Sequence, residues 1–173
     1  MDVSWKEALS PALSSARKIA VLGVGNTSKG DDGAGAVCAE RLKRRIPPDS
    51  ARILVIDGGE VPEHHTGEIR RFDPDLTLIV DAAVAGRAPG AISVIERDAI
   101  ADDGISTHRI SLRYLIRYLE ETIGGAVYVL GIEPETTGLT LERTALSAGV
   151  EKSVQEIADF ILTKIHPGPD GRS

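Results

Sequence analysis

Four carboxylate side chains stand at the carboxyl ends of segments that read as β-strands. Asp32 follows an apolar strand at 19–24, and Glu133 follows a strand late in the chain. Asp57 and Asp81 each end a strand between these two. Ligands of open α/β sheets bind outside the carboxyl ends of the strands, so the four acids are expected on one edge. A single aspartate there is usually a turn former or a helix cap, but crowded carboxylates repel one another and need a cation or raised pKa values. The pattern favours a cation site or an acid–base site.

His108 is the histidine best placed to join these acids, because it directly precedes a predicted helix. The ordinary alternative is that it caps the helix or satisfies a loop. His64 and His65 lie in a polar stretch and His166 lies near the end of the chain, so we expect these three to be solvated. Two aspartates and one histidine are the metal set that the residues allow. Such an incomplete oxygen and imidazole set suits nickel, zinc or manganese, with positions left open for another ligand.

The turn after the first strand is rich in glycine. Gly23 and Gly25 allow a tight turn or a close approach of another group. In nucleotide-binding proteins such a turn cradles phosphate on the N–H groups of a helix start. Here Asp31 and Asp32 occupy that place and would repel a pyrophosphate, and the third glycine of the dinucleotide motif is missing. A dinucleotide-binding oxidoreductase is therefore a less favoured alternative.

Strands alternate with helices along the chain. The apolar segments predicted as strands are 19–24, 52–57, 76–81, 91–95 and 126–132. Helical spacing of apolar residues predicts helices at 33–46, 61–71, about 109–123 and 148–165. Because most of these strands are apolar throughout, we expect a mostly parallel sheet with helices on both faces. The short strand at 91–95 has partial alternation and is expected at an edge, where one antiparallel strand could lie.

The N-terminal segment at 1–17 is expected to be an amphipathic extension of the main domain. Pro11 should kink or split it, with Ser10 as the cap of a second short helix. Residues 18–166 are then a single α/β domain, and 167–173 a loose tail. The last predicted helix is followed by proline and glycine, which agrees with that boundary.

Composition excludes several classes of protein. The chain has 173 residues and a formal net charge of −6, with acids and bases mixed and no basic tract, so we expect no nucleic-acid or membrane partner. Its one cysteine, Cys38, falls on the apolar face of a predicted helix and is expected to be a packed thiol. The N-terminus lacks the layout of a signal peptide, and no apolar run approaches the ~20 residues of a membrane span. We expect a cytoplasmic protein.

Several motifs together resemble the [NiFe]-hydrogenase maturation endopeptidases. In order they are Gly23-Val24-Gly25-Asn26, Gly30-Asp31-Asp32-Gly33-Ala34-Gly35, Asp57-Gly58-Gly59, Val80-Asp81-Ala82, Thr107-His108 and Leu130-Gly131-Ile132-Glu133-Pro134. The resemblance covers nearly the whole domain, from Lys18 to Ile165. It is closest to the branch that processes the large subunit of formate-hydrogenlyase-type and Ech-type hydrogenases. The family's fold is a three-layer α/β/α sandwich, in agreement with the pattern of strands and helices.

The resemblance implies which residues form the site. It selects Asp32, Asp81 and His108 as metal ligands, with Asp32 and Asp81 as catalytic carboxylates. The residues left with a substrate-binding or supporting role are Gly25, Asn26, Asp31, Asp57, Gly58, Gly59 and Glu133. The implied cofactor is nickel supplied by the substrate precursor, and another divalent metal could occupy the site in the free protein.

The resemblance also implies the function. The enzyme would remove a C-terminal peptide from the hydrogenase large-subunit precursor once nickel is inserted, recognising the bound nickel. Hydrolysis could be of the aspartic type, with a carboxylate as general base, or metal-assisted, with a polarised carbonyl and an activated water. A non-catalytic chaperone that senses nickel through the same three ligands is the main alternative.

Overall fold

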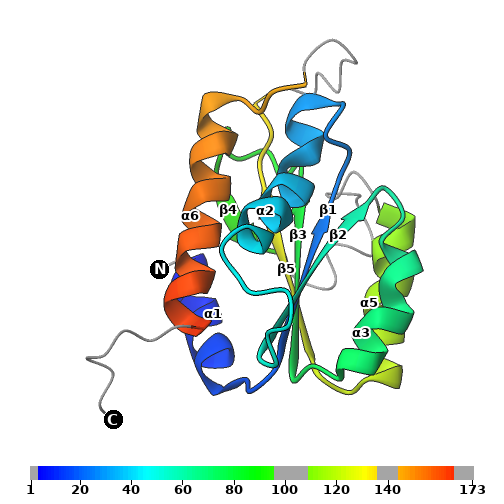
Figure 1. The fold of residues 1–173 in the computed structure, drawn as a ribbon. Helices are drawn as coiled ribbons and strands as arrows, with labels where there is room; N and C mark the ends of the chain where they lie inside the picture. Colours follow the sequence, from blue (N-terminus) through cyan, green and yellow to red (C-terminus); the bar gives the residue numbers. More distant parts are fainter. Residues whose placement is uncertain (1–3, 96–108, 136–143, 166–173) are drawn as a thin grey trace.

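The computed structural model describes residues 4–95, 109–135 and 144–165 (Figure 1). The predicted tail at 167–173 lies outside these ranges. In chain order the elements are α1 (Trp5–Ser15), β1 (Ile19–Val24), η1 (Gly30–Gly33), α2 (Ala34–Lys43), β2 (Ile53–Gly59), η2 (Pro62–His65), α3 (Thr66–Phe72), β3 (Leu76–Ala82), β4 (Ile92–Val94), α5 (Arg109–Thr122), β5 (Ala126–Ile132) and α6 (Ala148–Ile165). The helices η1 and η2 are of the 3-10 type.

The strands form one sheet in the order β2-β1-β3-β5-β4. All neighbouring strands pair in parallel except β4, which runs antiparallel to β5 at the edge. Every residue of β1 and of β3 is buried, as expected for inner parallel strands with both faces covered. The predicted mostly parallel sheet with one antiparallel edge strand is confirmed.

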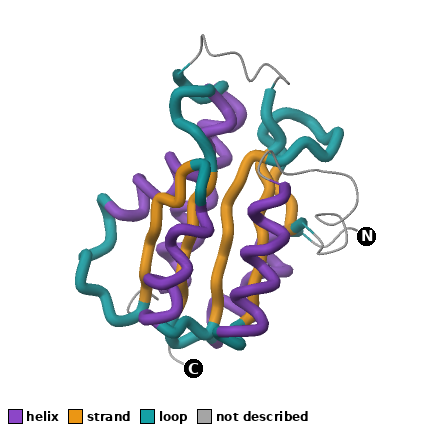
Figure 2. The backbone as a smooth tube through the Cα atoms, turned by 90° about the vertical axis from the view of Figure 1, so that its right-hand side faces the viewer, coloured by secondary structure: helices purple, strands orange, loops and turns teal. Residues whose placement is uncertain are grey.

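Helices cover both faces of the sheet (Figures 1 and 2). On one face α1, α2 and α6 pack into a core that includes Leu13, Leu42 and Ile161. On the other face α3 and α5 pack into a second core that includes Ile69 and Leu115. The sheet thus separates two apolar cores, which is the predicted α/β/α sandwich.

The prediction that Pro11 splits the N-terminal segment is wrong. α1 is one helix that contains Pro11, and its cap is Ser4 rather than Ser10. The hydroxyl of Ser4 accepts a hydrogen bond from Glu7 N, while Ser4 N donates to the Glu7 carboxylate at 3.0 Å. An interior proline costs about 3 kcal/mol in a helix. The capping box and the burial of the apolar face of α1 against α6 offset that cost.

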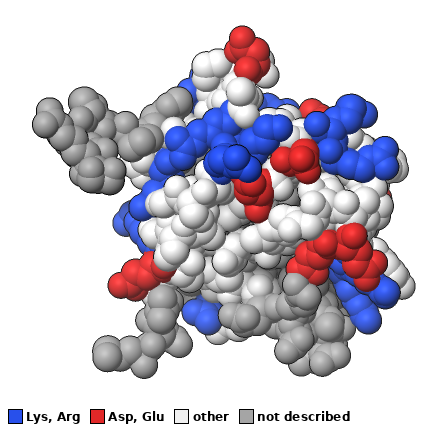
Figure 3. Space-filling view, turned by 90° about the horizontal axis from the view of Figure 1, so that it is seen from below, with Lys and Arg blue, Asp and Glu red and all other residues white. Residues whose placement is uncertain are grey.

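The amino ends of the strands are held by polar contacts around a hollow of about 530 Å³. There the Asp75 carboxylate accepts from Arg17 N at 2.9 Å and from Lys18 N at 2.8 Å. The Arg52 guanidinium donates to the carbonyl oxygens of Lys164 and Ile165, the last residues of α6. Figure 3, seen from this end, shows Lys and Arg side chains spread across the surface. Asp75 and Arg52 thus bind the backbone of the chain itself. The opposite end of the sheet, where the strands have their carboxyl ends, is therefore the better place for a site.

Candidate active site

Asp32 is placed by a turn that folds back onto the end of β1. Asp32 lies in η1 and is buried, with 4% of its surface exposed. Its Oδ2 atom accepts a hydrogen bond from Asn26 N at 3.1 Å. Gly25 has φ +134°, and a Cβ atom there would lie 1.9 Å from the carbonyl oxygen of Asp32. The close approach that Gly25 permits is therefore that of the Asp32 backbone, which gives Gly25 a supporting role.

Asp81 is brought to the same edge by the neighbouring strand. It lies in β3, is fully buried and is paired in register with Gly131. The chain just before Asp81 touches the start of α2, where a Cβ atom on Gly35 would lie 2.0 Å from the carbonyl oxygen of Val80. η1 also contacts β3. The structure thus places two buried carboxylates at the carboxyl end of the sheet, Asp32 in η1 after β1 and Asp81 in the neighbouring strand β3.

Asp57 ends up in a different environment from these two acids. It is exposed, and its Oδ1 atom accepts from Gly59 N at 3.1 Å within its own turn. Gly59 has φ +54°, and its carbonyl oxygen accepts from Gly25 N at 2.9 Å. Gly58 packs closely against β1, because a Cβ atom added to Gly58 would lie 2.8 Å from Cδ1 of Leu22. Asp57, Gly58 and Gly59 therefore shape a turn that supports Gly25.

Asn26 connects the site turn to a charged pair at the surface. Its Nδ2 atom donates to Glu60 Oε2 at 2.9 Å, and Lys29 Nζ donates to Glu60 Oε1 at 2.8 Å. The hydrogen bond to Glu60 raises the pKa of Lys29. Neither Lys29 nor Glu60 was among the residues expected at the site. Lys29 lies inside the glycine-rich motif, and Glu60 directly follows Gly59. These positions are the signal that could have pointed to them.

Glu133 holds the segment that follows β3. It is 6% exposed, and its Oε2 atom accepts from Ala85 N at 2.8 Å. Its backbone carbonyl accepts from Gly90 N at 2.8 Å, and its N–H donates to the carbonyl oxygen of Ala91 at 2.9 Å. These bonds fix the chain between Asp81 and β4, so Glu133 supports the edge of the site from β5.

The Asp31 carboxylate binds different donors from those of its neighbour Asp32. Its Oδ1 atom accepts from Ser147 N at 2.7 Å, and its Oδ2 atom accepts from Glu135 N and from the Ser147 hydroxyl, each at 2.9 Å. Asp31 therefore joins η1 to residues at the far end of the chain.

The third predicted ligand, His108, lies outside the described residues. Among the residues that the structure describes, no three His, Cys, Asp or Glu side chains form a group that could hold a metal ion. His65 lies 3.6 Å from Glu68 in the stretch that contains α3. Of the three predicted ligands, the structure describes Asp32 and Asp81, and both are buried. Burying a carboxylate is costly, and a bound cation would offset that cost.

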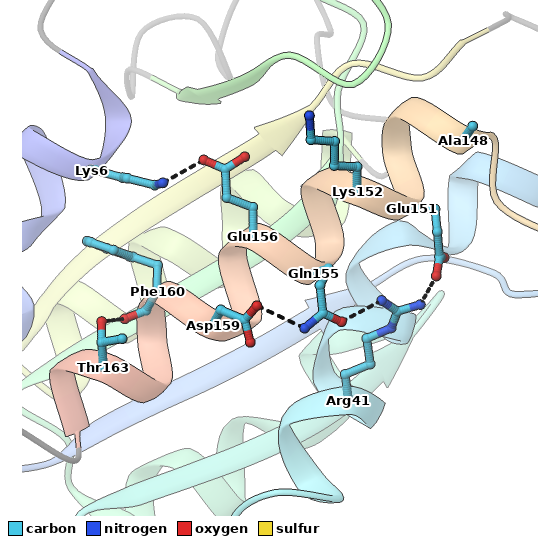
Figure 4. A pocket seen from close by; sticks show the side chains of 10 residues that line it. All are labelled: Lys6, Arg41, Ala148, Glu151, Lys152, Gln155, Glu156, Asp159, Phe160 and Thr163. Carbon is cyan, nitrogen blue, oxygen red and sulfur yellow. Dashed lines mark hydrogen bonds and ion pairs between the residues drawn. The ribbon is translucent and has the colours of Figure 1, made fainter. Parts of the chain in front are cut away.

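Another hollow is lined largely by side chains that pair with one another. It has a volume of about 880 Å³ and lies along α6, bordered by α1 and α2 (Figure 4). Lys6 pairs with Glu156 at 2.7 Å, and Arg41 donates to Gln155 at 3.0 Å and pairs with Glu151. These contacts join α1 and α2 to α6.

The single cysteine of the sequence, Cys38, lies in the core. Cys38 is fully buried in the core, which confirms the predicted packed thiol, and burial raises its pKa to about 12. A thiol with that pKa is not a nucleophile at neutral pH.

Within the described ranges no helix has both the length and the apolar character to cross a membrane.

Comparison with known proteins gives consistent matches. Residues 36–164 match the family model HycI, described as hydrogenase maturation protease. The hydrogenase 3 maturation protease of Escherichia coli K12 is 42% identical over 119 residues, which are 68% of this chain and 74% of that protein. A putative hydrogenase maturation protease of Methanocaldococcus jannaschii is 30% identical over 135 residues, 75% of this chain and 80% of that protein.

Solved structures match over nearly the whole chain. The crystal structure of the [NiFe] hydrogenase maturation protease HycI from Thermococcus kodakarensis KOD1 superimposes with a TM-score of 0.80 at 30% identity. That match covers 91% of this chain and 98% of the other. The hydrogenase maturating endopeptidase HybD from E. coli matches with a TM-score of 0.68 at 28% identity, over 87% of this chain and 93% of the other.

Proposed function

Because this chain belongs to the HycI family of hydrogenase maturation proteases, we propose that it cleaves a [NiFe]-hydrogenase large-subunit precursor only after nickel has been inserted. Family membership makes the chain a peptidase that removes the C-terminal peptide of such a precursor. The finer proposal is that cleavage requires nickel in the precursor, a nickel checkpoint, and that specific residues of this chain bind that nickel. The observation that carries it is that Asp32, in η1 after β1, and Asp81, in the adjacent strand β3, are both buried carboxylates within the motifs that resemble the family's.

The donor set suits a divalent ion that arrives with the substrate. Asp32 and Asp81 provide oxygen ligands, and we propose His108 as an imidazole ligand beside them. Three protein ligands would leave positions open for groups of the precursor. The nickel is then part of the substrate, and a precursor without it would lack the ion that binds these acids. A second divalent metal could take the same ligands in the free protein.

The chemistry required is hydrolysis of one peptide bond. Water adds its oxygen to the scissile carbonyl carbon, the C–N bond breaks, and one proton reaches the departing amine. A buried carboxylate can take the proton from the water and pass it to the amine, which is the aspartic type of mechanism. A divalent ion would supply a polarised carbonyl and an activated water. In both versions the bond from Asn26 N holds Asp32 in place while the proton moves.

The direct test uses purified protein with nickel-loaded and nickel-free large-subunit precursor, followed by intact-mass analysis. We expect loss of the C-terminal peptide from the loaded precursor alone. Equal cleavage of both precursors would remove the nickel checkpoint. Tight binding of the loaded precursor with no cleavage would favour the nickel-sensing chaperone, and bound NAD or FAD would revive the oxidoreductase interpretation.

A variant series tests the ligand assignment. Asp32→Asn, Asp81→Asn and His108→Ala are each expected to lower processing by at least about 100-fold, because each removes a charge or a ligand from the reacting centre. The control is Asp75→Asn at the opposite edge of the sheet, which keeps an oxygen for the N–H groups of Arg17 and Lys18. Normal processing by the three site variants would contradict the assignment.

We also propose that processing takes place in the cytoplasm. The support is the cysteine content: a single cysteine cannot form an internal disulfide, so the composition does not call for an oxidising compartment. Cell fractionation followed by detection of the protein and of the unprocessed precursor would test this location. Both in an exported fraction would contradict it.

A further inference from the structure

The Asp31 carboxylate binds three donors that come from two distant places in the chain. Ser147 N and the Ser147 hydroxyl lie 2.7 and 2.9 Å from its oxygens, and Glu135 N lies 2.9 Å away. Ser147 is 2% exposed, and its two bonds to Asp31 are partly buried. Hydrogen bonds to an ionised acceptor are stronger than bonds between neutral groups. Asp31 is therefore a strong anchor and not a surface charge.

The anchor connects three elements at the carboxyl edge of the sheet. Asp31 belongs to η1, and Glu135 lies shortly after β5. Ser147 directly precedes α6, and its carbonyl oxygen accepts from Glu151 N at 2.8 Å in the first turn of that helix. An acid at a helix start would normally serve its own helix. η1 is only four residues long, and the bonds of the Asp31 side chain go to other elements instead.

Asp31 and Asp32 hold the same short turn from two sides. The Asp32 carboxylate accepts from Asn26 N, close to the end of β1. The Asp31 carboxylate is bound to Glu135 and Ser147, more than one hundred residues away in sequence. A 3-10 turn has poor internal hydrogen-bond geometry, so contacts such as these decide its orientation. Moving the Asp31 anchor would therefore move the Asp32 backbone with it.

We propose that Asp31 is a positioning residue for the peptidase reaction: its three hydrogen bonds fix η1 so that the Asp32 carboxylate meets the substrate correctly. Asp31 itself need not touch the precursor. This inference rests on the function proposed above, because it assigns Asp31 a role in that same site. The role belongs to the catalytic step, since misplacing a catalytic group lowers the rate more than it weakens binding.

Two substitutions would remove different hydrogen bonds of the Asp31 carboxylate. Each Asp31 oxygen accepts a backbone N–H group, so Asp31→Asn must present its NH₂ group to either Glu135 N or Ser147 N and leave that donor unpaired. Ser147→Ala removes the hydroxyl bond alone. The control Asp75→Ala frees two backbone N–H groups at the opposite edge of the sheet.

Processing kinetics form the first measurement, with nickel-loaded precursor and at a temperature well below every melting point. We expect Asp31→Asn to lower kcat by about 10- to 100-fold with KM within about twofold. Ser147→Ala should lower kcat less, and Asp75→Ala should match the wild type. Wild-type kcat in Asp31→Asn would overturn the proposal, as would an equal loss of kcat in Asp31→Asn and Asp75→Ala.

Amide hydrogen exchange provides a measurement that does not need activity. The N–H of Asn26 is bound to Asp32, so its exchange rate reports the position of the Asp32 carboxylate. In Asp31→Asn we expect faster exchange at Asn26, Glu135 and Ser147, with no change at Asn26 in Asp75→Ala. Unchanged exchange at Asn26 in Asp31→Asn would overturn the proposal. A wild-type protein that fails to cleave would contradict the proposed function instead, and this measurement would still decide the positioning role.

Discussion

At the scale of single residues, the acids of the carboxyl edge differ in what they hold. Asp32 and Asp81 are buried, whereas Asp57 is exposed and accepts a bond from its own turn. A buried carboxylate is costly unless it is well bound, so its retention in a folded protein needs a reason. An exposed aspartate in a turn has an ordinary one. Burial therefore sets Asp32 and Asp81 apart from Asp57, although the supporting Glu133 is buried as well.

Substitution of Asp57 tests this separation. An asparagine side chain also has an oxygen that can accept from Gly59 N. We therefore expect Asp57→Asn to process the precursor within about twofold of the wild-type kcat/KM, while Asp57→Ala loses the turn bond and about 1 kcal/mol of stability. Processing assays and urea unfolding would measure both effects. If Asp57→Asn proves as inactive as Asp32→Asn, then Asp57 belongs with the catalytic acids.

At the scale of elements, α1 is part of the core and not an appendage. Leu9 and Leu13 are fully buried, and the Trp5 ring meets the Phe160 ring of α6 edge-on, with centroids 4.9 Å apart. Lys6 pairs with Glu156 of the same helix. The N-terminal segment therefore stabilises α6, the helix whose start is bound to Asp31.

The contribution of α1 can be measured by truncating one of its buried side chains. Leu13→Ala removes a fully buried side chain and is expected to lower the free energy of unfolding by about 2–5 kcal/mol. The exposed neighbour gives a matched control, with Ser14→Ala expected within about 0.5 kcal/mol of the wild type. Urea denaturation followed by circular dichroism would measure both. Equal stabilities would mean that α1 is dispensable to the core.

Much of this element pattern could be predicted from sequence, and the failures have physical causes. The strand at 19–24 and the helix at 148–165 were predicted with the observed bounds, because their apolar residues are continuous or follow a helical period. The expected split at Pro11 is wrong because the helix-breaking effect of proline was considered without the burial that holds α1 together. The partners of Asp31 were out of reach, since Glu135 and Ser147 meet it only through the tertiary fold.

At the scale of the whole molecule, the two ends of the sheet have different tasks. The carboxyl end carries the buried Asp32 and Asp81. The amino end is held by Asp75, which binds the chain before β1, and by Arg52, which binds the last carbonyl groups of α6. Asp75 lies at the opposite end of the strands from the proposed catalytic acids, which is why it serves as a control for the site.

The anchoring carboxylates predict how stability depends on pH. Hydrogen bonds from the backbone of Lys18 lower the pKa of Asp75, and the bond from Arg45 lowers the pKa of Asp159. Such groups stabilise the fold above their unfolded pKa of about 3.9, and that contribution is lost as the pH falls through the folded pKa. Urea unfolding between pH 7 and about pH 2 should show this loss. Asp75→Asn should make the acid side less steep, and an unchanged slope would contradict the assignment.

The order of strands has a consequence for the time course of folding. β1 pairs only with β2 and β3, which both lie later in the chain, and parallel pairing requires a long crossover for each. Such non-local contacts make folding slow. Asp32 and Asp81 cannot meet before the β1–β3 pairing exists. A newly made chain should therefore become an active peptidase late in folding, so that recovered activity reports the completed sheet.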